Sequence, residues 1–119
     1  MKKLLNLILI FFFLSNTLAN ASTMYCKVDK AYKCEEGGCN EFKSEIFINI
    51  DTNRNTYQRG DTKGLDTYNM NIFKSGNFII AEVEGSATLK IDTINNMRFV
   101  EIVHLGLSSY NNFGMCKLN

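Results

Sequence analysis

Apolar and polar residues alternate with a period of two along most of the chain beyond residue 21, and no segment keeps a helical period over ten residues. In "SEIFINI" three isoleucines alternate with other side chains, and "FIIAEVE" places Ile79, Ala81 and Val83 on one face. Turn-forming stretches such as "DTNRN", "SGN" and "TINN" separate these segments. The pattern predicts seven or eight short strands joined by tight turns.

Each predicted strand offers about three apolar side chains to one face. A meander of such strands hides its edges by curling until the first and last strands meet. We therefore predict an all-β domain, a small antiparallel up-and-down β-barrel, with a two-sheet β-sandwich as the alternative. Bulky side chains fill so short a barrel, and a lipid-sized cavity is not favoured. The residues expected inside are Phe42, Ile46, Ile48, Ile50, Tyr57, Tyr68, Met70, Ile72, Ile79, Val83, Leu89, Ile91 and Phe99.

The N-terminus has the pattern of an export signal. Lys2 and Lys3 precede the apolar run "LLNLILIFFFL", and Ala19 and Ala21 match the small residues before a cleavage site. The run is short for a membrane-spanning helix, which needs about 20 residues. We expect residues 1–21 to be a cleaved secretory signal peptide and residues 22–119 to form one domain. A retained N-terminal anchor is the alternative.

All four cysteines lie beyond the predicted signal peptide. An even number in a short exported chain argues for two disulfides, with three possible pairings. We favour Cys34–Cys39, which closes a tight local loop, and Cys26–Cys116, which ties the two ends of the domain. Export with disulfides suits the periplasm first and release to the extracellular space second.

Charge excludes one class of partner. The chain has 13 basic and 12 acidic residues, and the two signs are interspersed. Proteins that bind phosphate backbones carry a basic patch or stripe, and none is evident here. We expect no nucleic-acid partner.

The segment "KCEEGGCNEFKSEIF" (33–47) is echoed by "RGDTKGLDTYNMNIF" (59–73), at an offset of 26. The echo keeps a glycine, an acid and an aromatic residue but replaces Cys34 and Cys39 by glycine and leucine. We interpret both segments as the same loop-then-strand unit, which a disulfide closes in one of the two copies. The Cys34–Cys39 pair is then structural.

Metal and redox sites are disfavoured. A zinc site wants four ligands, and the second cysteine pair typical of zinc knuckles is missing. A catalytic redox pair is usually Cys-x-x-Cys at a helix start. "DTNRNT" begins like a calcium loop, but its sixth position is Thr56 and its twelfth is Thr62, where glycine and glutamate are required. We expect a hairpin turn there, no metal and no cofactor.

The only histidine, His104, is the main candidate for catalysis. No nucleophile motif such as Gly-x-Ser-x-Gly occurs. Glu101 and Arg98 lie nearby, but on a strand Glu101 points to the face opposite Arg98 and His104. We expect no catalytic residues and no enzyme activity.

Two aromatic residues, Phe47 and Phe73, occupy equivalent positions of the echoed units and face away from the expected core. Together they could form an apolar patch for a partner. Burial under a loop or a second sheet is the alternative.

The export signal, an early Tyr-x-Cys motif, the strand count and the last-strand Cys116 together resemble the periplasmic inhibitors of C-type lysozyme. The resemblance implies a barrel, a disulfide between the end cysteines, and a Ser-Gly-x-x-Tyr loop that enters the enzyme's cleft. Here Ser75 and Gly76 are followed by Asn77 and Phe78, so the tyrosine is missing. The pair Cys34–Cys39 also lies outside that pattern. Ser75 and Gly76 become candidate partner contacts.

These observations favour an exported, non-enzymatic envelope protein that binds a protein or polymer. An inhibitor of a cell-wall hydrolase is one alternative. A carrier of a small ligand is the other, and it requires a cavity.

Overall fold

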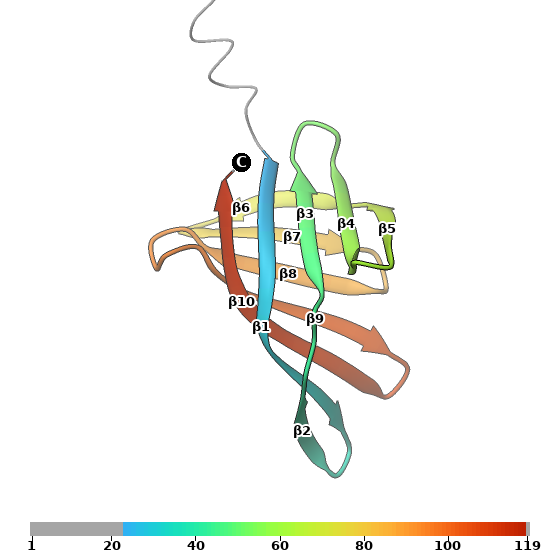
Figure 1. Ribbon diagram of the computed structural model, residues 1–119. Coiled ribbons are helices and arrows are strands. Elements are labelled where there is room, and N and C mark those ends of the chain that lie inside the picture. The colour runs from blue at the N-terminus through green and yellow to red at the C-terminus, as the bar shows by residue number, and fades with distance from the viewer. Residues whose placement is uncertain (1–22, 119) are drawn as a thin grey trace, which may run out of the picture.

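The protein is described here by a computed structural model, which describes residues 23–118. The predicted signal peptide, residues 1–21, lies outside the described residues. Between residues 23 and 118 the chain forms ten strands and no helix, and so no helix that could cross a bilayer (Figure 1). The strands are β1 (Thr23–Glu35), β2 (Gly38–Phe42), β3 (Phe47–Asp51), β4 (Thr56–Asp61), β5 (Gly64–Asn69), β6 (Asn71–Ser75), β7 (Phe78–Val83), β8 (Ala87–Asp92), β9 (Arg98–Leu105) and β10 (Ser108–Leu118).

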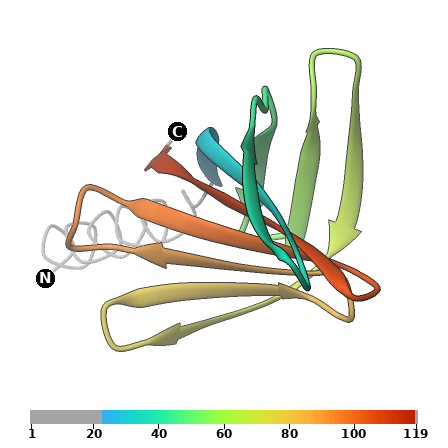
Figure 2. The same ribbon diagram turned by 90° about the horizontal axis from the view of Figure 1, so that it is seen from below.

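All strands belong to one antiparallel sheet that curls almost into a closed barrel (Figure 1; Figure 2). The order along the sheet is β5–β4–β3–β1–β10–β9–β8–β7–β6, and β2 pairs with β1 alone. Because β1 pairs with β10, the first and last strands meet, as predicted. The two ends of the sheet, β5 and β6, are consecutive in the chain and separated only by Met70. The predicted antiparallel barrel is confirmed, and the sandwich alternative is wrong.

The structure has more strands than the predicted seven or eight, and its first strand is longer than the sequence pattern indicates. A register shift between Val28 and Lys30 marks a β-bulge in β1. Because of the bulge, the inward position after Val28 is Ala31, three residues later. This breaks the period of two in the sequence, although the strand continues to Glu35. In addition, β2 and β5 are exposed along their whole length, and no apolar alternation reveals them.

The echoed segments do form equivalent hairpins. Each has a two-residue turn, and Cys34 faces Cys39 in the first as Gly60 faces Leu65 in the second. After the hairpin, β3 continues on the same partner as β2, namely β1, whereas β6 pairs with β7 and not with β4. The shared hairpin is therefore confirmed, with a disulfide closing one copy, and the strand that follows it differs between the two copies.

Apolar side chains from the inward positions fill the barrel. The buried core residues are Met24, Cys26, Val28, Ala31, Ile48, Ile50, Tyr57, Met70, Ala81, Leu89, Ile91, Phe99 and Cys116, with Ile46, Ile72, Ile79, Val83 and Met97 packed against them. The prediction was wrong for Phe42 and Tyr68, which are 37% and 39% exposed. Phe42 lies on β2, which pairs with no strand but β1, and Tyr68 lies on β5, whose second edge has no partner strand.

Both predicted disulfides are present. Cys26 and Cys116 are directly opposite each other in the β1–β10 ladder, so this bond ties the strands that complete the wall. No thiol in residues 23–118 is free to hold zinc or to act in redox chemistry. Two disulfides are compatible with an oxidising compartment, periplasmic or extracellular.

The stretch that begins like a calcium loop forms the β3–β4 hairpin. The Asp51 carboxylate accepts hydrogen bonds from the backbone N–H groups of Asn53 (3.0 Å) and Arg54 (3.1 Å). Asn55 has φ = 52°, a left-handed conformation that asparagine tolerates in turns. The carboxylate thus stabilises a turn, as the hairpin interpretation expects.

Candidate functional site

A buried polar cluster lies inside the barrel around Glu101, whose side chain is completely buried. The carboxylate accepts hydrogen bonds from the Tyr57 hydroxyl, from Arg59 Nε (3.0 and 3.2 Å) and from Asn112 Nδ2 (2.7 Å). A buried carboxylate is tolerated only when it is paired and hydrogen-bonded. These donors therefore make the polar part of the core.

Ionisation of Tyr57 is suppressed by the same surroundings. Burial is the main cause that raises the pKa of the Tyr57 hydroxyl, and the nearby Glu101 carboxylate raises it further. The hydroxyl consequently stays protonated and keeps donating to Glu101. This cluster and the apolar core together occupy much of the barrel interior.

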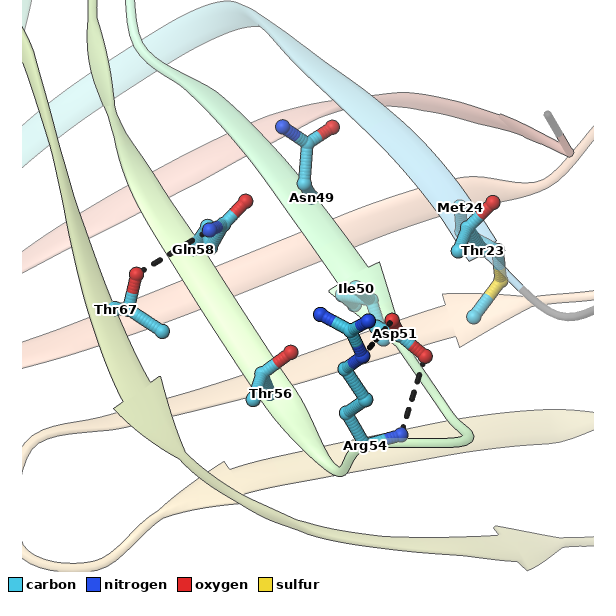
Figure 3. Close-up of a pocket in the computed structure, with 9 residues that line it drawn as sticks. All are labelled: Thr23, Met24, Asn49, Ile50, Asp51, Arg54, Thr56, Gln58 and Thr67. Carbon is cyan, nitrogen blue, oxygen red and sulfur yellow. Dashed lines mark hydrogen bonds and ion pairs between the residues drawn. The ribbon is translucent and has the colours of Figure 1, made fainter.

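A polar groove of about 400 Å³ runs over the outside of β1, β3, β4 and β5 (Figure 3). It forms because outward positions on these strands carry short or planar polar side chains between buried apolar neighbours. Asn49, for example, lies between Ile48 and Ile50, which are buried. The polar side chains that line the groove are those of Thr23, Asn49, Asp51, Arg54, Thr56, Gln58 and Thr67.

The groove follows one row of directly paired residues across the sheet. Asn49 on β3 pairs with Gln58 on β4, and Gln58 pairs with Thr67 on β5. On the other side Asn49 pairs with Tyr25 on β1, which pairs with Lys117 on β10. Directly paired residues share one face of a sheet. The row therefore begins with the Lys117 cation and the Tyr25 ring, continues with the amides of Asn49 and Gln58, and ends with the Thr67 hydroxyl.

Hydrogen-bonding capacity is left over in this row. Gln58 Nε2 donates to Thr67 Oγ1 (3.3 Å), which leaves the Gln58 carbonyl oxygen exposed to the groove. The Asn49 amide makes no side-chain hydrogen bond with any residue in 23–118. Arg54 Nε lies 3.9 Å from Asp51 Oδ2, so the two charges largely offset each other.

An aromatic pair borders the groove. The rings of Tyr25 and Phe47 lie 5.7 Å apart with a 31° interplanar angle. Lys117 Nζ lies 5.5 Å from the centre of the Tyr25 ring, within the range of a cation–π contact. The Tyr25 ring is half-buried and contacts both neighbours.

The structure does not bring the predicted partner-contact residues together. Phe47 lies beside Tyr25 on β3, whereas Phe73 is 45% exposed on β6 and borders a separate apolar hollow of about 430 Å³. Ser75 and Gly76 lie at the β6–β7 hairpin, where Gly76 has φ = +59°. Phe73, Ser75 and Gly76 are therefore close together on β6 and its turn, whereas Phe47 lies apart from them on β3.

The acid–base trio is also not assembled. Glu101 points into the barrel, while Arg98 and His104 are exposed on the other face of β9, as the alternation predicts. Glu101 already accepts three donors from Tyr57, Arg59 and Asn112. Glu101 and His104 therefore lie on opposite faces of β9.

Sequence reasoning missed Tyr25, Asn49 and Gln58. A signal was present for Asn49, which lies between two isoleucines in "FINI". If the isoleucines point inward, the alternation of a strand places the asparagine on the outer face. What the sequence could not reveal is that strand pairing aligns these three residues in one row.

Comparison with known proteins adds no assignment. No protein-family model matches the chain, and no curated protein or solved structure matches it either.

Proposed function

We propose that this chain is an exported, non-enzymatic binding module of the cell envelope, acting in the periplasm. The observation that carries the proposal is the outer groove beside Tyr25 and Phe47, where no residue in 23–118 bonds to the Asn49 side-chain amide. Binding pockets combine apolar or aromatic surface with a few placed polar groups. The groove has this combination. A small-ligand carrier would instead use the apolar hollow of about 430 Å³ beside Met24, Ile72 and Ile79.

Two further observations support parts of the proposal. The separation of Glu101 from His104 supports a non-enzymatic role, because general acid–base catalysis needs groups that converge on a substrate. The export pattern in residues 1–21 and the two disulfides support the periplasm as the compartment.

The test is a pull-down from periplasmic extract with oxidised protein comprising residues 22–119. Wild-type protein is compared with Tyr25→Ala, which removes the ring beside the groove. Ile94→Ala, an exposed substitution in the β8–β9 turn, is the matched control. We expect a partner that wild type and Ile94→Ala retain and Tyr25→Ala loses. A partner retained equally by all three would place binding elsewhere and contradict the proposal.

A second candidate is inhibition of a cell-wall hydrolase through the β6–β7 hairpin. The favouring observation is the tight, exposed turn at Ser75 and Gly76, which projects a Ser-Gly pair from the barrel. Purified protein would then slow a C-type lysozyme, and Ser75→Arg would abolish the effect. Thr62→Arg, in the β4–β5 turn, is the control that should leave it unchanged. Unaltered lysozyme activity with wild-type protein would exclude this candidate.

A further inference from the structure

We infer that the outer groove binds an uncharged, hydroxyl-rich chain, that is, a neutral polysaccharide segment. The inference rests on the proposed binding function and names the ligand class that the groove would take. Four observations carry it: the charge balance of the groove, its free amide and hydroxyl groups, the fixed ring at its border, and its length across the sheet.

The groove has no net charge to offer an ionic ligand. Among residues 23–118 its only charged side chains, Asp51 and Arg54, lie 3.9 Å apart, and Asp51 is also engaged by the turn backbone. An acidic peptide or a nucleic acid would need unpaired cations, and a basic peptide would need unpaired carboxylates. Lys117 lies over the Tyr25 ring and outside the groove lining, so the charge balance of the lining favours a neutral ligand.

The remaining polar groups both donate and accept. The Asn49 amide has two N–H donors and a carbonyl acceptor, none of them used by a residue in 23–118. The Gln58 carbonyl and the hydroxyls of Thr23 and Thr56 line the same groove. Neighbouring hydroxyls of a sugar ring are likewise both donors and acceptors, so a planar amide can bond to two of them at once. An apolar ligand would leave these groups without partners, which costs free energy.

The Tyr25 ring supplies an apolar surface next to Asn49. One face of a sugar ring is made of C–H groups, which pack well on an aromatic ring while the hydroxyls bond to amides. Contacts with Phe47 at 5.7 Å and with Lys117 at 5.5 Å hold the Tyr25 ring in place. A ring that is already held loses little conformational entropy on binding.

The length of the row favours a chain over a single ring. The row from Tyr25 to Thr67 crosses four strands. Strands in a sheet are spaced by 4.7–4.9 Å, so three such steps give a row of about 14 Å. We therefore expect longer oligosaccharides to bind more tightly than disaccharides.

The experiment is isothermal titration of oxidised protein, residues 22–119, with defined probes. The neutral probes are β-1,4-linked oligomers of N-acetylglucosamine, glucose and mannose, each as dimer and hexamer, and the acidic probe is an oligogalacturonate. We expect one neutral hexamer to bind at least about tenfold more tightly than its dimer, with little dependence on salt.

Variants locate the binding. Asn49→Ala with Gln58→Ala, and separately Tyr25→Ala, should each weaken hexamer binding about tenfold or more. Tyr25→Phe keeps the ring and should retain most of the affinity. Lys90→Ala and Ile94→Ala, away from the groove, should leave it unchanged. Circular dichroism of each variant establishes that the barrel is folded.

Three outcomes would overturn the inference: no neutral probe binds, the acidic probe binds more tightly and is displaced by salt, or hexamer binding is unaffected by the groove variants. Each is distinguishable from failure of the proposed function. If the pull-down yields a protein partner that depends on Tyr25 while no glycan binds, the binding function stands and the polysaccharide ligand is wrong.

Discussion

Arg59 on β4 binds the carboxylate of Glu101 on β9, with Nε 3.0 Å from Oε2, although the two strands are not neighbours in the sheet. The shorter way round the wall from β4 to β9 passes β3, β1 and β10. The ion pair therefore crosses the interior of the barrel and joins opposite walls. It also balances a carboxylate that is completely buried.

Removing the cation should destabilise the barrel strongly. Arg59→Met keeps much of the volume but leaves Glu101 with neutral donors only, and breaking a buried pair in this way costs about 3–5 kcal/mol. We expect a loss of that order in the free energy of unfolding, measured by urea denaturation. Replacing both partners, as Arg59→Met with Glu101→Met, should recover part of the loss. Arg54→Met, which removes an exposed cation, is the control and should change stability little. Equal effects of Arg59→Met and Arg54→Met would contradict the role given to the pair.

Alkaline pH should unfold the barrel through Tyr57. Burial, with the Glu101 carboxylate beside it, raises the pKa of the folded-state hydroxyl above the ordinary value of 10.0. A raised folded-state pKa means that the stabilisation is fully present below the unfolded pKa and is lost as the pH rises above it. From about pH 10 upward, the free energy of unfolding should fall by up to about 1.4 kcal/mol per pH unit from this group. Tyr57→Phe should remove this part of the slope, as followed by urea denaturation at several pH values. An identical slope in Tyr57→Phe would show that other groups cause it.

The two disulfides should differ in how much they stabilise the fold. Cys26–Cys116 spans 90 residues and Cys34–Cys39 spans 5. In the chain-entropy model the long loop contributes about 4–5 kcal/mol and the short loop about 2 kcal/mol. Replacing each pair by alanines and measuring thermal unfolding should give the larger decrease for the long loop. A larger decrease from the short loop would mean that the first hairpin, and not the closure, limits stability.

Gly114 should not tolerate a side chain. It lies opposite Val28 and Phe99, and an added Cβ would overlap the Lys27 carbonyl and the Phe99 ring. Gly114→Ala should therefore destabilise the barrel by about 1–3 kcal/mol, the usual range for overpacking. Gly37→Ala is the control, because a Cβ there meets no atom within 4 Å. Equal stability of the two variants in urea would show that the β1–β10 contact can relax.

Much of the fold could be predicted from the sequence because inward positions alternate regularly. Ile48 and Ile50, or Leu89 and Ile91, are buried as the pattern indicates. The pattern failed at the bulge between Val28 and Lys30, where the alternation of inward and outward positions shifts by one residue. It failed again at β2 and β5, since an exposed strand needs no apolar face.

The candidate site was harder to predict, for a physical reason. Parity assigns Asn49 and Gln58 to the outer surface, but strand pairing decides that they are neighbours. Pairing depends on the β-bulge and on the turn lengths, which the alternation does not encode. The inward glutamate shows the same limit: Glu101 is in phase with Phe99, yet only the curling of the sheet brings Arg59 to it.

The change of partner at Met70 has a consequence for how the barrel moves. β5 pairs only with β4 and β6 only with β7, and this break lies three strands from the Cys26–Cys116 junction in one direction and four in the other. The barrel wall is therefore open between β5 and β6, and the Cys26–Cys116 disulfide lies on the opposite side of the barrel. Widening of the barrel concentrates at β5 and β6, whose backbone amides should exchange with deuterium sooner than those of β1 and β10. Thr67, the last residue of the groove row, lies on this compliant segment, so a bound chain would slow exchange there first.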